Sequence, residues 1–195
     1  RTITVEITGT NDKPTLSGTV TGNVTEDGTT TATGKLDVAD VDVNDKHTWT
    51  VNNDGKGAYG KFTVDQNGNW KYELDNASDK VQALKGGEKV TDTITVTVDD
   101  GHGGTATKDI TVTITGTNDA AVVTPSKPGA DAGIVTEDVT ETASGKLNVT
   151  DKDAGEAVFK PQTDFQGKYG TFSIDANGNW SFKLDNNAAA IQQLG

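Results

Sequence analysis

The sequence predicts an all-β fold made of tandem β-sandwich domains. The hexapeptide ITGTND occurs at residues 7–12 and again at 114–119, one domain length apart. Apolar residues make up only 32% of the 195 residues while Gly reaches 23, which suits sheets that bury every second side chain and turns that need Gly. Apolar positions also alternate along short segments that Asn-Gly and Asp-Gly turns separate. Strands are therefore expected along nearly the whole chain.

A longer internal repeat sets the domain boundaries. The segment YGKFTVDQNGNWKYELDN at 59–76 returns as YGTFSIDANGNWSFKLDN at 169–186, and eleven of the eighteen positions are identical. GKLDVADVD at 34–42 returns as GKLNVTDKD at 145–153. We expect three parts in a piece of a longer chain. These are the last strand of a preceding repeat at 1–12, a complete repeat at 13–119, and a second repeat at 120–195 that stops before its last two strands.

Alternating apolar residues mark the expected strands, which centre on residues 36–38, 62–64, 70–74, 94–98 and 110–114. One helical turn is expected at 79–84. Asn67-Gly68 predicts a hairpin turn, because its Gly arrives two residues too early for an EF-hand loop. Trp70 and Trp180 recur at strand spacing, which favours core positions over a platform for sugars. About seven strands per repeat in a Greek key indicate an immunoglobulin-like or cadherin-like sandwich.

The charge balance excludes several classes of partner. A net charge of −12 disfavours nucleic acid and anionic membrane surfaces, whereas divalent cations prefer carboxylate and carbonyl oxygens. The chain has no Cys, which excludes disulfides and thiolate metal sites, and it has no long apolar run that would insert into a membrane. His47 and His102 are isolated, and the glycines of DDGHGG at 99–104 predict a tight turn. We therefore expect no enzymatic activity.

The motifs taken in order resemble the VCBS repeat, a tandem domain of large bacterial RTX-type surface adhesins. The resemblance rests on TED, GKLDVADVD, YGKFTVDQNGNWKYELDN, QAL, the DDGHGG turn and ITGTND, in this order and with matching gaps. It implies a cadherin-like sandwich, dependence on Ca²⁺, and a secreted protein of the bacterial cell surface that leaves by type I secretion and supports adhesion or biofilm. Such repeats often read GTNDAP at the joint; here the joints read GTNDKP and GTNDAA.

The resemblance to cadherin-like domains also implies a set of Ca²⁺ ligands at the joints. An acidic motif early in the repeat, a second one after a later strand, the ND of the linker and a D-x-D motif of the following repeat would converge on the ions. The implied ligands are Glu26, Asp75, Asn118, Asp119, Asp151 and Asp153 at one joint, with Asp12, Asp40 and Asp42 at the other. The alternative is that these Asn and Asp residues only cap strands and build turns.

Two functions fit these observations. The leading hypothesis is a structural extender module of the adhesin, whose partners are the neighbouring repeats of the same chain. The alternative is a recognition module that binds a host or surface glycan or protein. Its best candidate is the loop that differs most between the copies, VNNDGKGAYG at 51–60 against KPQTDFQGKYG at 160–170.

Overall fold

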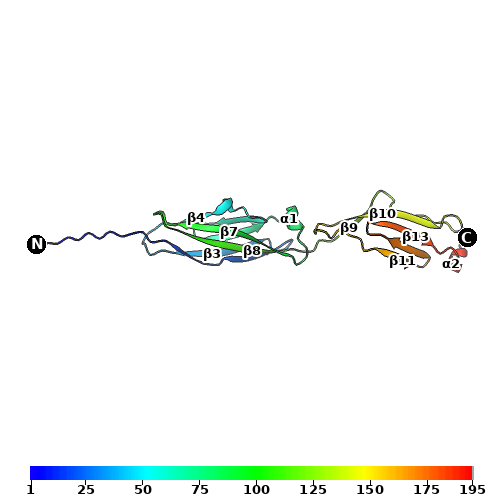
Figure 1. Ribbon diagram of the computed structural model, residues 1–195, viewed down its shortest axis with the longest axis horizontal. Coiled ribbons are helices and arrows are strands. Elements are labelled where there is room, and N and C mark those ends of the chain that lie inside the picture. Colours follow the sequence, from blue (N-terminus) through cyan, green and yellow to red (C-terminus); the bar gives the residue numbers. More distant parts are fainter. Residues whose placement is uncertain (195) are drawn as a thin grey trace. The chain divides into compact units, whose positions relative to one another are not determined.

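A computed structural model describes residues 1–194 and divides the chain into two compact units, residues 1–118 and the part from residue 119 onward. Figure 1 shows both units as β-structures, with two short helices, α1 (Asp79–Gln82) and α2 (Ala189–Gln192). The all-β prediction is therefore confirmed. The helical turn expected at 79–84 is α1. Among the described residues, none of the helices has the length and apolar character needed to cross a membrane.

The first unit is a sandwich of two four-stranded sheets. One sheet has the order β1-β3-β6-β5, and the other has the order β2-β8-β7-β4. All neighbouring strands are antiparallel except β2 and β8, which run parallel. The bounds of the first sheet are Thr15–Gly18 (β1), Thr31–Ala39 (β3), Asn69–Leu74 (β6) and Gly60–Val64 (β5). Those of the second are Thr21–Thr25 (β2), Thr105–Thr115 (β8), Lys89–Asp99 (β7) and Thr48–Val51 (β4).

Alternation along these strands fills the space between the two sheets. Trp70 is 2% exposed, and its indole Nε1–H donates to the carbonyl oxygen of Thr19 at 2.8 Å. A Cβ at Gly34 would lie 2.5 Å from the Trp70 ring, so the glycine makes room for the indole on the neighbouring strand. The prediction that Trp70 is a core residue is confirmed. The other large core side chains are Tyr72, Phe62, Leu36, Ile110 and Ile114.

One buried carboxylate connects the two sheets of this sandwich. Asp92 on β7 is 3% exposed and accepts three hydrogen bonds. The backbone N–H groups of Ala58 and Tyr59 donate to it at 2.8 Å each, and the Tyr72 hydroxyl donates at 3.0 Å. Burial, followed by the charge of Asp92, raises the pKa of Tyr72, so the hydroxyl stays protonated and can donate. This network ties the loop before β5 to both sheets.

The turn at Asn67-Gly68 is a plain hairpin turn, as the sequence predicts. Gly68 has a φ of 78°, a conformation that favours glycine. The Asp65 carboxylate accepts from the backbone N–H groups of Asn67 and Asn69 at 2.8 and 2.9 Å, and from the Asn69 side chain at 2.8 Å. These three donors all belong to the turn itself. The Asp of DQNG therefore closes the hairpin, because its carboxylate binds backbone N–H groups of the turn.

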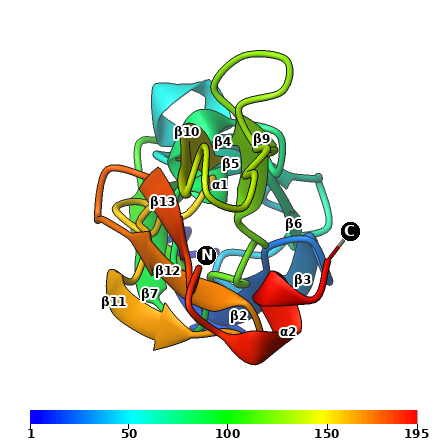
Figure 2. The ribbon, with the colours of Figure 1, turned by 90° about the vertical axis from the view of Figure 1, so that its right-hand side faces the viewer.

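The second unit forms a single five-stranded sheet of order β11-β12-β13-β10-β9 in the described residues (Figure 2). Its strands are Val122–Pro125 (β9), Thr142–Thr150 (β10), Gln162–Gln166 (β11), Gly170–Ile174 (β12) and Asn179–Leu184 (β13). Trp180 repeats the Trp70 arrangement, because it is 8% exposed and donates to the Ala130 carbonyl at 2.7 Å. Trp180 is therefore a core residue, as predicted. β11 pairs with β12, although the corresponding region of the first unit forms a 3-10 turn at Asn52–Gly55.

Candidate metal-binding sites

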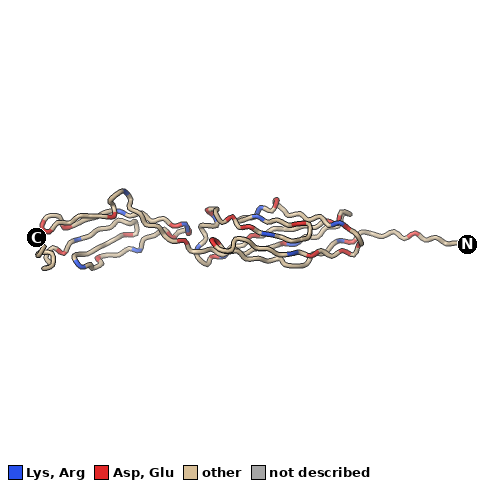
Figure 3. Tube along the Cα trace, turned by 180° about the vertical axis from the view of Figure 1, so that it is seen from behind, with Lys and Arg blue, Asp and Glu red and all other residues tan. Residues whose placement is uncertain are grey.

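Three carboxylates gather at one end of the first unit. Asp40 follows β3, Asp45 lies in the loop before β4, and Asp100 follows β7. Each offers a carboxylate oxygen, and these oxygens all lie within 4.8 Å of one another. The two strands that carry Asp40 and Asp100 belong to different sheets of the sandwich and end at this group. Figure 3 shows the acidic residues at the end of the first unit from which the N-terminal segment emerges.

The turn between β7 and β8 fixes Asp100. Its Oδ1 accepts from the backbone N–H groups of His102 and Gly104 at 2.7 and 2.9 Å, and its Oδ2 accepts from the side-chain amide of Asn11 at 2.9 Å. The bond from Asn11, followed by those of the turn, lowers the pKa of Asp100 below its usual 3.8. The carboxylate is therefore charged at neutral pH, although it is only 1% exposed. The glycines of DDGHGG form the tight turn that the sequence predicts.

Asp45 and Asp40 each face one of the two histidines of the chain. The Nε2 of His102 lies 3.5 Å from Asp45 Oδ1, and that of His47 lies 3.4 Å from Asp40 Oδ2. Asp45 Oδ2 is buried and has no hydrogen-bond partner in the part of the chain that the structure describes. A buried carboxylate oxygen without a donor is costly, and a bound cation removes that cost. The group therefore has the negative charge and the open oxygen that a cation requires.

The repeated ITGTND motif makes the same contact in both units. The backbone N–H of Asp12 donates to Asp42 Oδ2 at 2.7 Å, and the backbone N–H of Asp119 donates to Asp153 Oδ2 at 2.8 Å. Each D-x-D motif is folded in the same way, because Asp42 N donates to Asp40 Oδ1 and Asp153 N donates to Asp151 Oδ1, both at 3.0 Å. The linker Asp is thus held by the second Asp of the D-x-D motif that follows it.

Asp153 is the most completely buried of the expected ligands of the second unit. It is 1% exposed, and its Oδ1 has no hydrogen-bond partner among residues 1–194. The other oxygen accepts from Asp119, whose carboxylate Oδ1 lies 3.4 Å from Lys152 Nζ. One oxygen of the Asp153 carboxylate therefore accepts a backbone hydrogen bond, whereas the other has no donor among the described residues. This arrangement repeats what Asp45 shows in the first unit.

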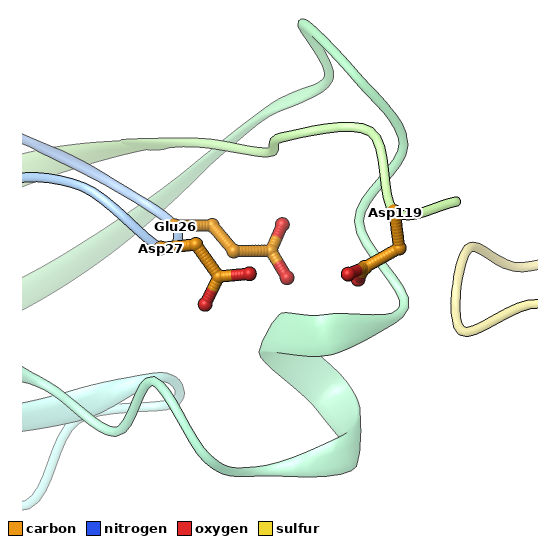
Figure 4. A group of neighbouring side chains, drawn as sticks. All are labelled: Glu26, Asp27 and Asp119. Carbon is orange, nitrogen blue, oxygen red and sulfur yellow. The ribbon is translucent and has the colours of Figure 1, made fainter.

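A second acidic group contains Asp119, which directly follows the first unit. Glu26, Asp27 and Asp119 each offer an oxygen within 4.8 Å of the others (Figure 4). Glu26 is 1% exposed, and its two oxygens accept from Thr117 N and Gln82 Nε2, both at 3.0 Å. Gln82 also donates to Asp27 Oδ1 at 3.2 Å, so one amide of α1 bridges two carboxylates.

The structure brings three of the nine expected ligands into these groups. Asp40 lies in the first group, and Glu26 and Asp119 in the second, while the pairs Asp12–Asp42 and Asp119–Asp153 are hydrogen-bonded. Asp151 accepts the bond that folds its own D-x-D motif. Asn118 is exposed beside Asp119. Asp75 is also exposed and belongs to neither group, and its backbone N–H and carbonyl are hydrogen-bonded to Tyr59 and Ser78 in the loop between β6 and α1.

Three members of the two groups were not among the predicted ligands. Asp27 directly follows Glu26, and a doublet of acids beside a strand end was the available signal. Asp100 lies in a stretch whose glycines indicate a turn. Its carboxylate both accepts a hydrogen bond from this turn and belongs to the first acidic group. Asp45 lies in a loop with no motif around it, so only the fold brings it close to Asp40 and Asp100.

The donor set decides which kind of ion these groups suit. All members of the two acidic groups offer carboxylate oxygens. Calcium takes six to eight oxygen ligands at about 2.3–2.6 Å, whereas zinc favours four nitrogen or sulfur ligands. Two buried oxygens, on Asp45 and Asp153, have no hydrogen-bond partner in residues 1–194. The residues present therefore fit calcium.

Comparison with known proteins identifies the fold. A family model described as a bacterial cadherin-like domain matches residues 11–116. A protocadherin gammaB7 fragment of domains EC3–6 is similar, with a TM-score of 0.51, 15% identity, and coverage of 89% of this chain and 40% of that one. Human CDH23 EC21–23 has a TM-score of 0.50 and 16% identity, and 91% of this chain and 55% of that one are covered. The chain thus spans about half or less of these structures. No curated protein matches the chain.

Proposed function

Because the chain belongs to the bacterial cadherin-like domain family, we propose that it is an extender module of a large bacterial surface adhesin. Its cadherin-like fold is a non-catalytic adhesion fold. The tandem repeat supports an extender role, since the core and turn residues are shared by both copies while no catalytic group is unique to one of them. The further assignment to VCBS-type repeats of a secreted RTX adhesin rests on the order of the motifs described above.

The proposal includes Ca²⁺ as the ion that stiffens the joints. The observation that carries it is the Asp153 carboxylate, which is 1% exposed and has one oxygen without a donor among the described residues. Carboxylates within 4.8 Å of one another repel each other in the absence of a cation. Glu26, Asp27 and Asp119 would hold an ion at one end of the first unit, and Asp40, Asp45 and Asp100 at the other. The ion supplies the positive charge that lets these carboxylates stay close together.

Calcium-dependent unfolding tests the proposal. A ligand that binds only the folded state adds about 2.7 kcal/mol at a hundredfold excess over its Kd. Since 1 kcal/mol shifts the Tm of a small domain by about 4–8 °C, scanning calorimetry should show a rise of roughly ten degrees or more in millimolar Ca²⁺ relative to EDTA. Magnesium at the same concentration should give a smaller rise, because it demands near-ideal octahedral geometry and dehydrates reluctantly.

Substitution of single carboxylates makes the test specific. Asp153→Asn should lose part of the calcium-dependent rise, because the open oxygen of Asp153 becomes an amide. Asp131→Asn is the matched control, since Asp131 is an exposed carboxylate of the same unit that is not among the expected ligands, whereas Asp153 is buried. Identical melting curves in Ca²⁺ and EDTA for the unsubstituted chain would contradict the proposal.

A further inference from the structure

The two D-x-D motifs share a backbone fold but differ in their middle residue. The motif reads Asp40-Val41-Asp42 in the first unit and Asp151-Lys152-Asp153 in the second. In both motifs the backbone N–H of the second Asp donates to the first Asp at 3.0 Å. The second Asp in turn accepts from the backbone N–H of the linker Asp, at 2.7 Å in the first unit and 2.8 Å in the second. A substitution of Val by Lys is therefore what distinguishes the two motifs.

Lys152 brings a positive charge to the linker Asp of its own unit. Its Nζ lies 3.4 Å from Asp119 Oδ1, while the backbone N–H of Asp119 donates to Asp153 Oδ2 at 2.8 Å. The side chains of Lys152 and Asp119 are 60% and 18% exposed, so the ammonium can leave the carboxylate for water. At the corresponding position of the first unit, Val41 is 74% exposed and carries no charge. The second motif therefore contains a cation, whereas the first contains none.

The same carboxylates are those that the proposed function gives to Ca²⁺. Asp119 belongs to the second acidic group, and Asp153 is 1% exposed with one oxygen that has no donor among the described residues. An ion bound by Asp119 would meet the Lys152 ammonium beside the same carboxylate. Positive charges this close repel each other, and a carboxylate oxygen that binds the ion can no longer hold the lysine. Lysine and Ca²⁺ therefore compete for one carboxylate.

We propose that Lys152 lowers the Ca²⁺ affinity of the second D-x-D motif by competing with the ion for Asp119, an inference that rests on the calcium binding proposed above. In the ion-free chain the ammonium neutralises part of the charge of the Asp119 carboxylate. Loss of an exposed ion pair, together with repulsion between the two cations, corresponds to about a threefold to tenfold loss of affinity. The middle residue of a D-x-D motif thus sets the Ca²⁺ concentration at which its joint stiffens.

Hydrogen exchange of the whole chain, followed by mass spectrometry across a Ca²⁺ titration, measures this affinity locally. Peptides that cover residues 119–125 and 147–156 report on the second motif, and the midpoint of their calcium-dependent protection gives the apparent affinity. Lys152→Met removes the charge but keeps an unbranched side chain, so the midpoint should fall about threefold to tenfold. Lys152→Arg keeps the charge and should leave the midpoint close to that of the unsubstituted chain. Lys160→Met, which removes an exposed lysine of the same unit, is the matched control and should shift the midpoint by less than about twofold.

The same peptides distinguish competition from a merely structural role of the lysine. In EDTA, Lys152→Met should exchange faster than the unsubstituted chain, because Asp119 and Asp153 lose a neutralising charge. In saturating Ca²⁺ it should exchange as slowly as the unsubstituted chain, since the ion then supplies that charge. A lysine that only supported the fold would instead speed exchange in both buffers and would leave the midpoint unchanged or higher, and that result would overturn the inference.

The first unit allows the reciprocal substitution. Val41 is exposed, so Val41→Lys leaves the core unchanged and gives the first motif the sequence DKD of the second. The midpoint in peptides that cover residues 40–47 should then rise about threefold to tenfold, while the peptides of the second motif keep theirs. Val41→Thr is the neutral control. Equal midpoints for Val41→Lys and Val41→Thr would contradict the competition.

The results separate this inference from the calcium binding on which it rests. Equal midpoints for the unsubstituted chain and Lys152→Met would overturn the role of the lysine, while calcium binding itself would stand. An equal shift in Lys160→Met would also overturn it, because the net charge of the unit would then explain the change. Absence of calcium-dependent protection in every variant would refute the proposed function and this inference together.

Discussion

The buried carboxylate of Asp92 should make a large contribution to the stability of the first unit. Its three hydrogen bonds come from Ala58 N, Tyr59 N and the Tyr72 hydroxyl, all within 3.0 Å. Tyr72→Phe removes one bond to a charged group, which is worth about 1.5–3 kcal/mol. Asp92→Ala leaves three donors without their acceptor at about 1–3 kcal/mol each, so we expect a loss of about 3–5 kcal/mol after partial access of water to the loop.

Urea unfolding followed by hydrogen exchange and mass spectrometry measures this loss, because peptides from β7 and β8 report on the first unit alone. Asp109→Ala is the matched control. Its carboxylate accepts from Thr95 Oγ1 at 2.7 Å on an exposed face of the same sheet, and its loss should cost less than about 1 kcal/mol. A Tyr72→Phe chain within about 0.5 kcal/mol of the unsubstituted chain would refute the reasoning. In the second unit the position of Tyr72 is occupied by Phe182.

Two further predictions concern the core and the turns. Gly34→Ala should destabilise the first unit by about 1–3 kcal/mol in urea unfolding, since its Cβ would lie 2.5 Å from Trp70, while Gly9→Ala, with no atom within 4 Å, should have no comparable effect. The bonds from Asn69 lower the pKa of Asp65 below 3.8. The stability they add is therefore complete above about pH 3.8 and is lost as the pH falls through the lowered pKa. In Asn69→Ala, an acid titration of the free energy of unfolding should lose the side-chain part of this component, while the bond from the backbone N–H of residue 69 remains.

The repeat and the alternation of apolar residues were sufficient to predict the fold class. Phe62, Trp70 and Tyr72 recur at period two on either side of an Asn-Gly turn, and the structure buries all three. Such local signals are strong because a strand that buries one face must alternate, and a two-residue turn limits the register. The D-x-D motifs were also recognisable, since their fold depends on bonds between residues two apart.

Features that depend on distant segments could not be predicted in this way. Asp45 joins Asp40 and Asp100 only because a loop returns to the ends of two strands from different sheets. The pairing of β11 with β12 was not predicted either, because the first unit forms a 3-10 turn at the corresponding residues and this loop differs most in sequence between the two copies. For Asp45 the local sequence leaves several conformations open, and tertiary contacts select one of them.

The central claim is that Ca²⁺ stiffens the joint between the units, and the distribution of distances across that joint tests it most directly. Spin labels on Lys61→Cys in β5 and Lys183→Cys in β13 occupy exposed strand positions outside the acidic groups. Pulsed electron paramagnetic resonance should give a narrow distribution in Ca²⁺ and a broad one in EDTA. Asp151→Asn with Asp153→Asn should remain broad in both buffers. Equal widths with and without Ca²⁺ in the otherwise unsubstituted chain would contradict the account.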